Sequence, residues 1–214
     1  MNGCIPILPR PLREVEAYWE ALRPYGDIPQ RCELSPSGLE NALEYTFILE
    51  RVAPSVTRFR MGGHKVAELL GLATERVPFT TLFTSDCQIE VAKAVEAVFQ
   101  NPGILRAELS SRRNIARPKL DAHLLLLPVK NDDNEVNRAL GVLHWEGRIG
   151  RAPRQFNEVR LNATRIVMNP LEYVQLSNQR VKEFDEHDLQ FTHKEKRPDI
   201  SGRPKLHVID GDKA

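Results

Sequence analysis

Apolar residues form two nearly continuous runs, at residues 120–129 and 136–145, on either side of a polar tip at residues 131–135. Leu- and Val-rich runs joined by an Asn/Asp-rich connector are typical of a β-hairpin with a longer loop. Because the runs do not alternate cleanly between apolar and polar positions, both strands are expected near the centre of a sheet with at least one covered face. The interior residues that this pattern predicts are Leu124, Leu126 and Val142.

Helical spacing of apolar residues predicts two longer helices and one short one. The first covers residues 11–23, with a proline in its first turn and an apolar stripe that includes Tyr18, Trp19 and Leu22. The second follows the cap residues 84–86 and ends at the Asn-Pro-Gly of residues 101–103. A short helix at residues 64–70 is expected to stop at a glycine.

Of four further segments, three have strand patterns and one has no clear pattern. Residues 45–52 and 56–61 are β-rich and predict a second hairpin, and residues 104–113 alternate as a strand with one wet face. Residues 156–168 fit neither a helix nor a strand period. The expected organisation is an irregular leader at 1–10, one α+β domain at 11–150, and a polar extension at 151–214 that reads as a solvated tail from about residue 190.

Composition excludes several classes of protein. The chain is 41% hydrophobic and 28% charged, and 30 basic against 29 acidic residues leave a net charge of +1. Such a balance implies no overall attraction to nucleic acid or acidic lipid. Cys4, Cys32 and Cys87 are far apart and odd in number, which favours reduced thiols in a cytoplasm, and no run suits a signal peptide or membrane span.

A set of short motifs over residues 18–143 resembles the PAS-domain proteins common in alphaproteobacteria. The motifs are YWEALR at 18–23, IPQRCELSP at 28–36, RFRMGG at 58–63, ELLG at 68–71 and LLLLPV…NRALGVL at 124–143. The resemblance implies a PAS-like five-stranded antiparallel sheet with helices on one face and a ligand pocket between them. To this α+β fold the chain would add the N-terminal helix and the C-terminal extension.

The resemblance also directs attention to cofactors. A haem-binding PAS domain usually offers an axial histidine from its long helix, and a light-sensing flavin version carries an Asn-Cys-Arg-Phe-like run before that helix. Residues 85–100 contain no histidine, and Cys87 stands in the sequence Ser-Asp-Cys-Gln-Ile. We therefore expect neither haem nor flavin, and assign no cofactor.

Four residues are candidates for contact with a ligand. Arg58 and Arg60 alternate with Phe59 and so share one face of a strand, beside a Gly-Gly pair. Together they could bind an anion, or they could be two solvated arginines on either side of a buried aromatic ring. His64 begins the short helix and His123 lies in an apolar strand, where a neutral core histidine is the alternative to a ligand contact. The candidate ligand-binding residues are Arg58, Arg60, His64 and His123.

The sequence offers no catalytic or metal-binding motif. The six histidines are not spaced as a metal set, and the chain lacks a nucleophile elbow, a phosphate-binding loop and a dinucleotide-binding loop. Basic clusters at residues 112–119 and 148–154 have no interleaved aromatic residues, so nucleic acid is an unlikely partner. No catalytic residue and no metal ligand are assigned.

These observations predict a cytoplasmic, non-catalytic sensory or protein-interaction module that binds a signalling partner or a small metabolite. One alternative is a small-molecule enzyme or carrier on a cone-shaped α+β fold with His64 or His123 as its base. Another is a nucleic-acid-contacting accessory protein that uses the basic loops. The first helix is too short to persist alone, so its stripe must dock either on the chain's own sheet or on a second subunit in a homodimer. The candidate interface residues are Tyr18, Trp19 and Leu22.

Overall fold

The structure is a computed structural model that describes residues 8–23 and 26–166. Its helices are α1 (Arg10–Ala21), α2 (His64–Leu70) and α3 (Ser85–Gln100). Its strands are β1 (Thr46–Ala53), β2 (Val56–Gly62), β3 (Gly103–Ser111), β4 (Leu120–Lys130), β5 (Val136–Trp145) and β6 (Glu158–Ile166). Single 3₁₀ turns are η1 (Arg31–Glu33), η2 (Pro36–Leu39), η3 (Leu43–Tyr45) and η4 (Phe79–Leu82).

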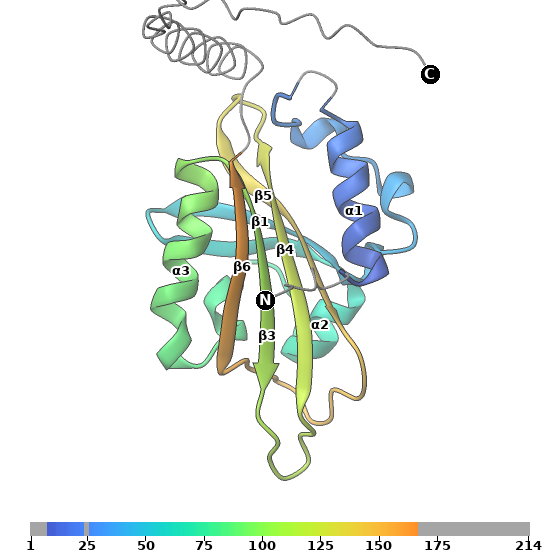
Figure 1. The fold of residues 1–214 in the computed structure, drawn as a ribbon, viewed down its shortest axis with the longest axis vertical. Helices are drawn as coiled ribbons and strands as arrows, with labels where there is room; N and C mark the ends of the chain where they lie inside the picture. Colours follow the sequence, from blue (N-terminus) through green and yellow to red (C-terminus); the bar gives the residue numbers. More distant parts are fainter. Residues whose placement is uncertain (1–7, 24–25, 167–214) are drawn as a thin grey trace, which may run out of the picture. The chain divides into compact units, whose positions relative to one another are not determined.

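Within the described residues, six strands form one antiparallel sheet in the order β2-β1-β5-β4-β3-β6 (Figure 1). The hairpin predicted first is β4–β5, with Leu125 opposite Val142 in its register. It occupies the middle of the sheet, where side chains on both faces are covered. Leu124, Leu126 and Val142 are all buried, as their continuous apolar runs predicted.

The expected α+β fold with an antiparallel sheet is confirmed, with six strands in place of five within the described residues. β6 pairs with β3 at the sheet edge and comes from the segment expected to be an extension, so the sheet continues to Ile166. An edge strand buries little, and here Glu158, Arg160 and Leu161 are exposed. For that reason the segment carries no clear alternation of apolar and polar residues.

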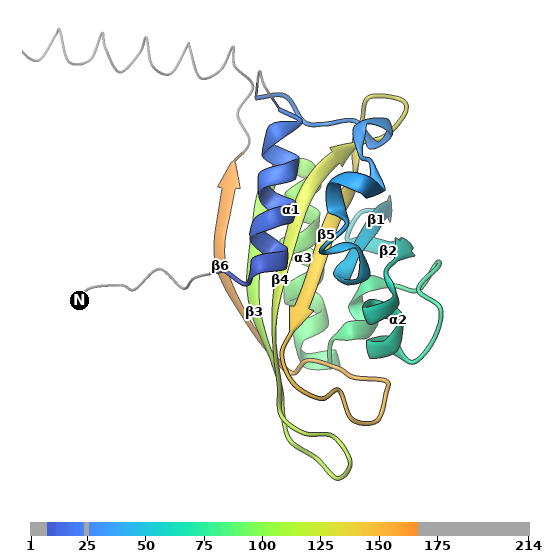
Figure 2. The same cartoon turned by 90° about the vertical axis from the view of Figure 1, so that its right-hand side faces the viewer.

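Helices cover both faces of the sheet and not one alone (Figures 1 and 2). Leu124 and Leu126 belong to the core that contains residues of α2 and α3, whereas Leu125 and Leu127 belong to a second core with α1. This division follows from the alternation of side chains along a strand. The β4 sequence is apolar at consecutive positions because each face has its own cover.

Trp19 fixes α1 to the sheet. Its side chain is 0% exposed, and its indole Nε1–H donates to the carbonyl oxygen of Pro128 in β4 at 2.9 Å. The guanidinium carbon of Arg23 lies 4.3 Å from the centre of the indole ring. Of the two outlets expected for this stripe, the chain's own sheet and a second subunit, Trp19 takes the first, because its side chain is buried within its own chain. Tyr18 and Leu22 are half-buried and pack against the same core.

An ion pair ties α3 to the β1–β2 hairpin. Arg51 of β1 donates to both carboxylate oxygens of Glu96, with an Nη2–Oε1 distance of 2.5 Å. Glu96 is 6% exposed and also accepts the backbone N–H of Ser55 and the side-chain amide of Gln100. The hydrogen bonds from Arg51 are the largest cause that lowers the pKa of Glu96, so the buried carboxylate stays charged.

Replacing Trp19 by alanine should destabilise the chain by about 3–5 kcal/mol, since the change removes a fully buried aromatic side chain. Urea unfolding measures the loss, and sedimentation should be the same for both proteins. Arg13→Ala, at an exposed position of the same helix, is the control and should change the unfolding free energy by less than about 0.5 kcal/mol. A conversion of dimer to monomer at unchanged stability would contradict the assignment.

The Glu96 pair should also make stability depend on pH. Because the folded-state pKa of Glu96 lies below 4.5, its stabilisation is complete above that pH and is lost as pH falls through the folded-state pKa. The difference in unfolding free energy between wild type and Glu96→Gln should thus be largest at neutral pH and shrink in acid. Glu146→Gln, which removes an exposed carboxylate, should show no such trend; a constant difference for Glu96→Gln would refute the charge assignment.

Candidate functional site

Aromatic side chains fill the interior between the sheet and the α2–α3 side. Phe47 and Phe59 come from β1 and β2, Phe79 and Phe83 from η4 and its end, and Phe156 from the approach to β6. Neighbouring rings lie 5.2–6.3 Å apart between centroids, mostly edge to face. All five are fully or almost fully buried. These rings occupy the space where the family resemblance placed a ligand pocket.

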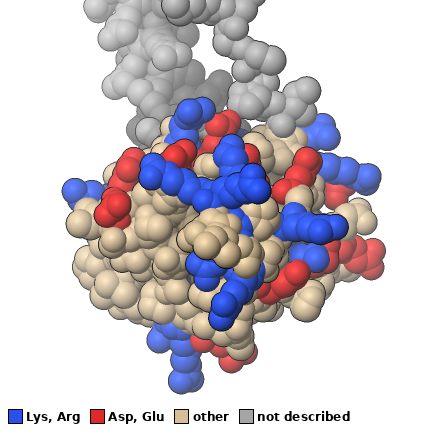
Figure 3. Space-filling view, turned by 90° about the horizontal axis from the view of Figure 1, so that it is seen from below, with Lys and Arg blue, Asp and Glu red and all other residues tan. Residues whose placement is uncertain are grey.

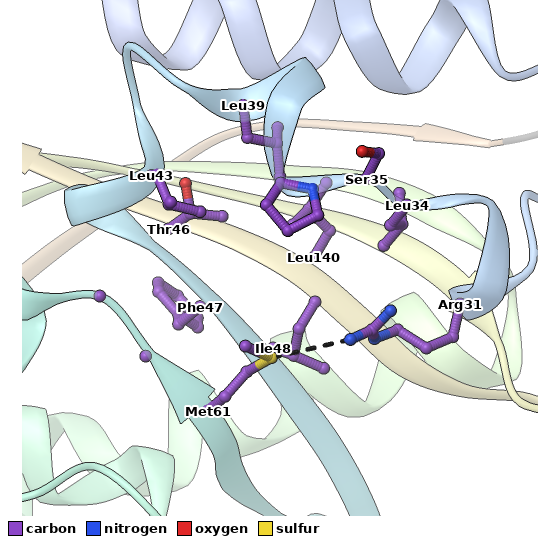
Figure 4. Close-up of a pocket in the computed structure, with 13 residues that line it drawn as sticks. Arg31, Leu34, Ser35, Leu39, Leu43, Thr46, Phe47, Ile48, Met61 and Leu140 are labelled. Carbon is purple, nitrogen blue, oxygen red and sulfur yellow. Dashed lines mark hydrogen bonds between the residues drawn. The ribbon is translucent and has the colours of Figure 1, made fainter.

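A groove of about 290 Å³ lies on the α1 side of the sheet instead. Figure 4 shows side chains of the 3₁₀ turns η1–η3 facing side chains of β1, β2 and β5 across this groove. Its wall is almost entirely apolar. The residues that line it are Arg31, Leu34, Ser35, Pro36, Leu39, Leu43, Thr46, Phe47, Ile48, Met61, Gly62, Gly63 and Leu140.

The rim of the groove combines exposed apolar groups with one cation. Met61 is 48% and Leu43 is 43% exposed, which is high for large apolar side chains. Arg31 lies across from Met61, with its Nη2 atom 3.9 Å from the thioether sulfur (Figure 4). No carboxylate of the described residues lies within ion-pair distance of Arg31, so its charge is not neutralised by this part of the chain.

Two glycines shape one end of the groove. A Cβ atom on Gly63 would lie 2.4 Å from the carbonyl oxygens of both Leu43 and Glu44. The N–H of Gly63 donates to the carbonyl oxygen of Thr46 at 2.8 Å, which holds β2 against the start of β1. The Gly-Gly pair thus permits close approach of the chain's own backbone and is not evidence for a bound anion.

Arg58 and Arg60 lie on one face of β2, as their alternation with the fully buried Phe59 predicted. Both pair with Glu50 of β1, at 3.0 Å from Arg58 Nη2 and 3.6 Å from Arg60 Nη1. This carboxylate already occupies the position that an anion would take between them. The arrangement is that of cross-strand ion pairs on a solvated face.

The two candidate histidines lie in different places. His64 is exposed at the start of α2 and lines a shallow depression with Glu40 and Glu44. His123 is half-buried in β4 and lines another depression, together with residues of β3 and β6. Its cross-strand neighbour is His144, whose pKa is lowered by burial and whose ring lies 4.9 Å from that of Tyr45. The structure does not bring His64 and His123 into one site.

The two basic loops, at residues 112–119 and 148–154, contact each other. The N–H of Arg151 donates to the carbonyl oxygen of Ala116 at 3.0 Å, and Arg117 Nε donates to the carbonyl oxygen of Arg151 at 3.1 Å. Figure 3 views the end of the molecule where these loops lie, with Lys and Arg side chains gathered at its middle and acidic ones towards the margin. We call these two loops together the double loop. Its exposed cations are Arg112, Arg113, Lys119, Arg148 and Arg151.

Arg154 belongs to the same sequence cluster but not to this surface. It is 1% exposed and donates to the Ser111 hydroxyl at 2.9 Å and to the carbonyl oxygens of Pro118 and Ile149. Burial lowers the pKa of its guanidinium. Arg154 joins the β3–β4 loop to the β5–β6 connection, and its role in the described residues is structural.

Other classes of site find no support in the described part of the chain. Among residues 8–23 and 26–166, no group of three or more His, Cys, Asp or Glu side chains is placed to hold a metal ion. Over the same residues, no helix has both the length and the apolar character needed to cross a membrane.

Sequence reasoning overlooked the groove. Arg31 and Met61 lie in the IPQRCELSP and RFRMGG motifs, which support the family resemblance but were not connected with each other. The sequence does not single out Arg31, because Asp27 stands four positions before it and Glu33 two positions after it. Only the fold brings that turn against β1 and β2.

Comparison with known proteins agrees with the architecture. A family model described as PAS domain matches residues 8–144. A solved light-oxygen-voltage domain studied with a flavin analogue is similar at 14% identity, over 52% of this chain and 84% of that one, with a TM-score of 0.40. The PAS domain of a Colwellia psychrerythraea protein is similar at 13% identity, over 50% and 92% of the two chains, with a TM-score of 0.37. No curated protein matches the chain.

Proposed function

The chain belongs to the PAS domain family, and we propose that this sensory module acts without catalysis, by contacting a partner protein. We also propose that its interior holds no cofactor. The observation that carries the proposal is the packing of Phe47, Phe59, Phe79, Phe83 and Phe156 between the sheet and the helices. Admitting a planar cofactor there would require several of these rings to move, and each buried ring contributes strongly to stability.

The double loop is the proposed contact surface. Its exposed arginines include Arg113 and Arg148, which make no ion pair with a described carboxylate. A partner with acidic side chains is complementary to such a surface, and arginine is suited to bidentate contact with carboxylates. Hydrogen bonds between the two loops hold their backbones together, which reduces the backbone entropy lost on binding.

Two further assignments belong to this proposal. The free thiols of Cys32 and Cys87 favour action in a reducing compartment such as the cytoplasm. The ordered motifs of residues 18–143 favour the group of PAS proteins common in alphaproteobacteria. Because Trp19 is buried within the chain, α1 is not proposed as a dimer contact.

The proposal for the interior is tested by what the purified protein retains. We expect no haem or flavin absorption, and no small molecule released in a one-to-one ratio when the Arg31→Glu variant is denatured and the supernatant analysed by mass spectrometry. This variant is the right material because it removes the cation beside the separate α1-side groove and leaves the interior intact. A Soret band, flavin bands, or a stoichiometric molecule retained by Arg31→Glu would contradict the proposal.

The contact surface is tested by charge reversal. A protein cross-linked to the wild-type chain in cells should be lost when Arg113→Glu and Arg148→Glu are combined, since attraction becomes repulsion. The matched control combines Arg13→Glu and Lys93→Glu, at exposed positions of α1 and α3. Equal recovery with both double variants, or no cross-linked protein with wild type, would overturn the assignment.

A further inference from the structure

We propose that the groove on the α1 side binds an amphiphilic carboxylate, with its hydrocarbon chain between the 3₁₀ turns and the sheet and its carboxylate on Arg31. This site opens on the α1 side of the sheet, whereas the packed interior on which the proposed function rests lies on the other side, and Phe47 borders both. The groove has both an apolar wall and a single cation. A purely structural crevice would need no cation, and a site for a polar ligand would need no apolar wall.

The wall suits a hydrocarbon chain. Leu34, Ile48 and Leu140 line the groove between η1 and the central strands, and Leu43 and Met61 leave apolar surface in contact with water at its rim. Covering such surface is favourable in proportion to its area. A volume of about 290 Å³ is at the lower end for small-molecule sites and suits a single acyl chain better than a fused-ring cofactor.

Arg31 suits a carboxylate. Within the described residues, its guanidinium has a hydrogen bond only to the thioether of Met61, which is a weak acceptor. Glu33, the nearest acidic residue along the chain, accepts the backbone N–H of Gln30 at 2.6 Å in the same turn. An arginine fork with free donors at the end of an apolar groove favours a planar anion and disfavours a cationic ligand.

The hydroxyl groups of the wall argue against an extended peptide as occupant. Thr46 Oγ1 donates to the carbonyl oxygen of Ala42 at 2.7 Å, and the hydroxyls of Ser35 and Ser37 share a hydrogen bond of 2.7 Å. Amide groups of a peptide lying along the groove would therefore find few free partners, and burying them unpaired is costly. A hydrocarbon chain carries no such groups.

The test compares decanoate with decanol on the full chain by isothermal titration calorimetry. Wild type should bind decanoate, and Arg31→Met, which keeps an apolar side chain of similar length, should weaken it roughly tenfold or more because a charge-assisted pair is lost. Binding of decanol should differ little between the two proteins. Arg13→Met, at an exposed position of α1, controls for the loss of one positive charge and should bind decanoate as wild type does.

Methyl NMR locates the site and checks the fold. Decanoate should shift the methyl signals of Met61, Leu34 and Ile48, while the spectrum of free Arg31→Met should otherwise match that of wild type. Absence of decanoate binding, equal affinity of wild type and Arg31→Met, or shifts confined to other residues would overturn the proposal. So would tighter, competing binding of a peptide with an apolar C-terminus. A negative result here does not bear on the proposal for the interior, because that proposal is tested separately with the Arg31→Glu variant.

Discussion

The central hairpin β4–β5 has apolar side chains on both faces, and the remaining architecture depends on covering both. Leu124 and Leu126 pack towards α2 and α3, and Leu125 and Leu127 pack towards α1. A sheet with this centre cannot leave one face to solvent without exposing a row of leucines. The helix that precedes the sheet and the turns of residues 31–45 are therefore part of the fold, because they provide the second cover.

This double cover gives the two faces different properties. On the α2–α3 side, rings from β1, β2, η4 and residue 156 pack against one another and leave the interior filled. On the α1 side, the cover consists of one helix and three short turns, which follow the sheet less closely than a long helix does. The groove beside Arg31 lies where that cover passes over β1 and β2. Space for a ligand thus arises on the opposite side from the packed rings.

Local signals in the sequence predicted most elements of this fold. The α2 helix was predicted at residues 64–70 with a glycine as its stop, and in the structure Gly71 ends it in a left-handed conformation at φ 71°. The edge strand β6 was not recognised, since a strand with exposed Glu158, Arg160 and Leu161 has no apolar period to detect. Packing of α1 on its own sheet was one of the two outlets considered for its apolar stripe, but the spacing of apolar residues does not show which face of the sheet such a stripe meets.

The candidate site was harder to predict for a different reason. Arg58, Arg60, His64 and His123 were selected for the chemistry of their side chains, whereas the groove consists mainly of leucine, isoleucine and methionine from three separate segments. Such residues look alike in a sequence whether they line a core or a groove. Arg31 stands close to Asp27 and Glu33 in the sequence, and only the structure shows that no carboxylate of the described residues pairs with it.

The hydrogen bond between Trp19 and Pro128 joins residues 109 positions apart. During synthesis, α1 therefore leaves the ribosome long before the strand that receives it has been made. A helix of 12 residues does not persist alone, so this segment remains open, with its tryptophan exposed, until β4 and β5 have paired. The α1 segment is therefore placed only after β4 has been made, and until then its apolar stripe has no sheet to cover it.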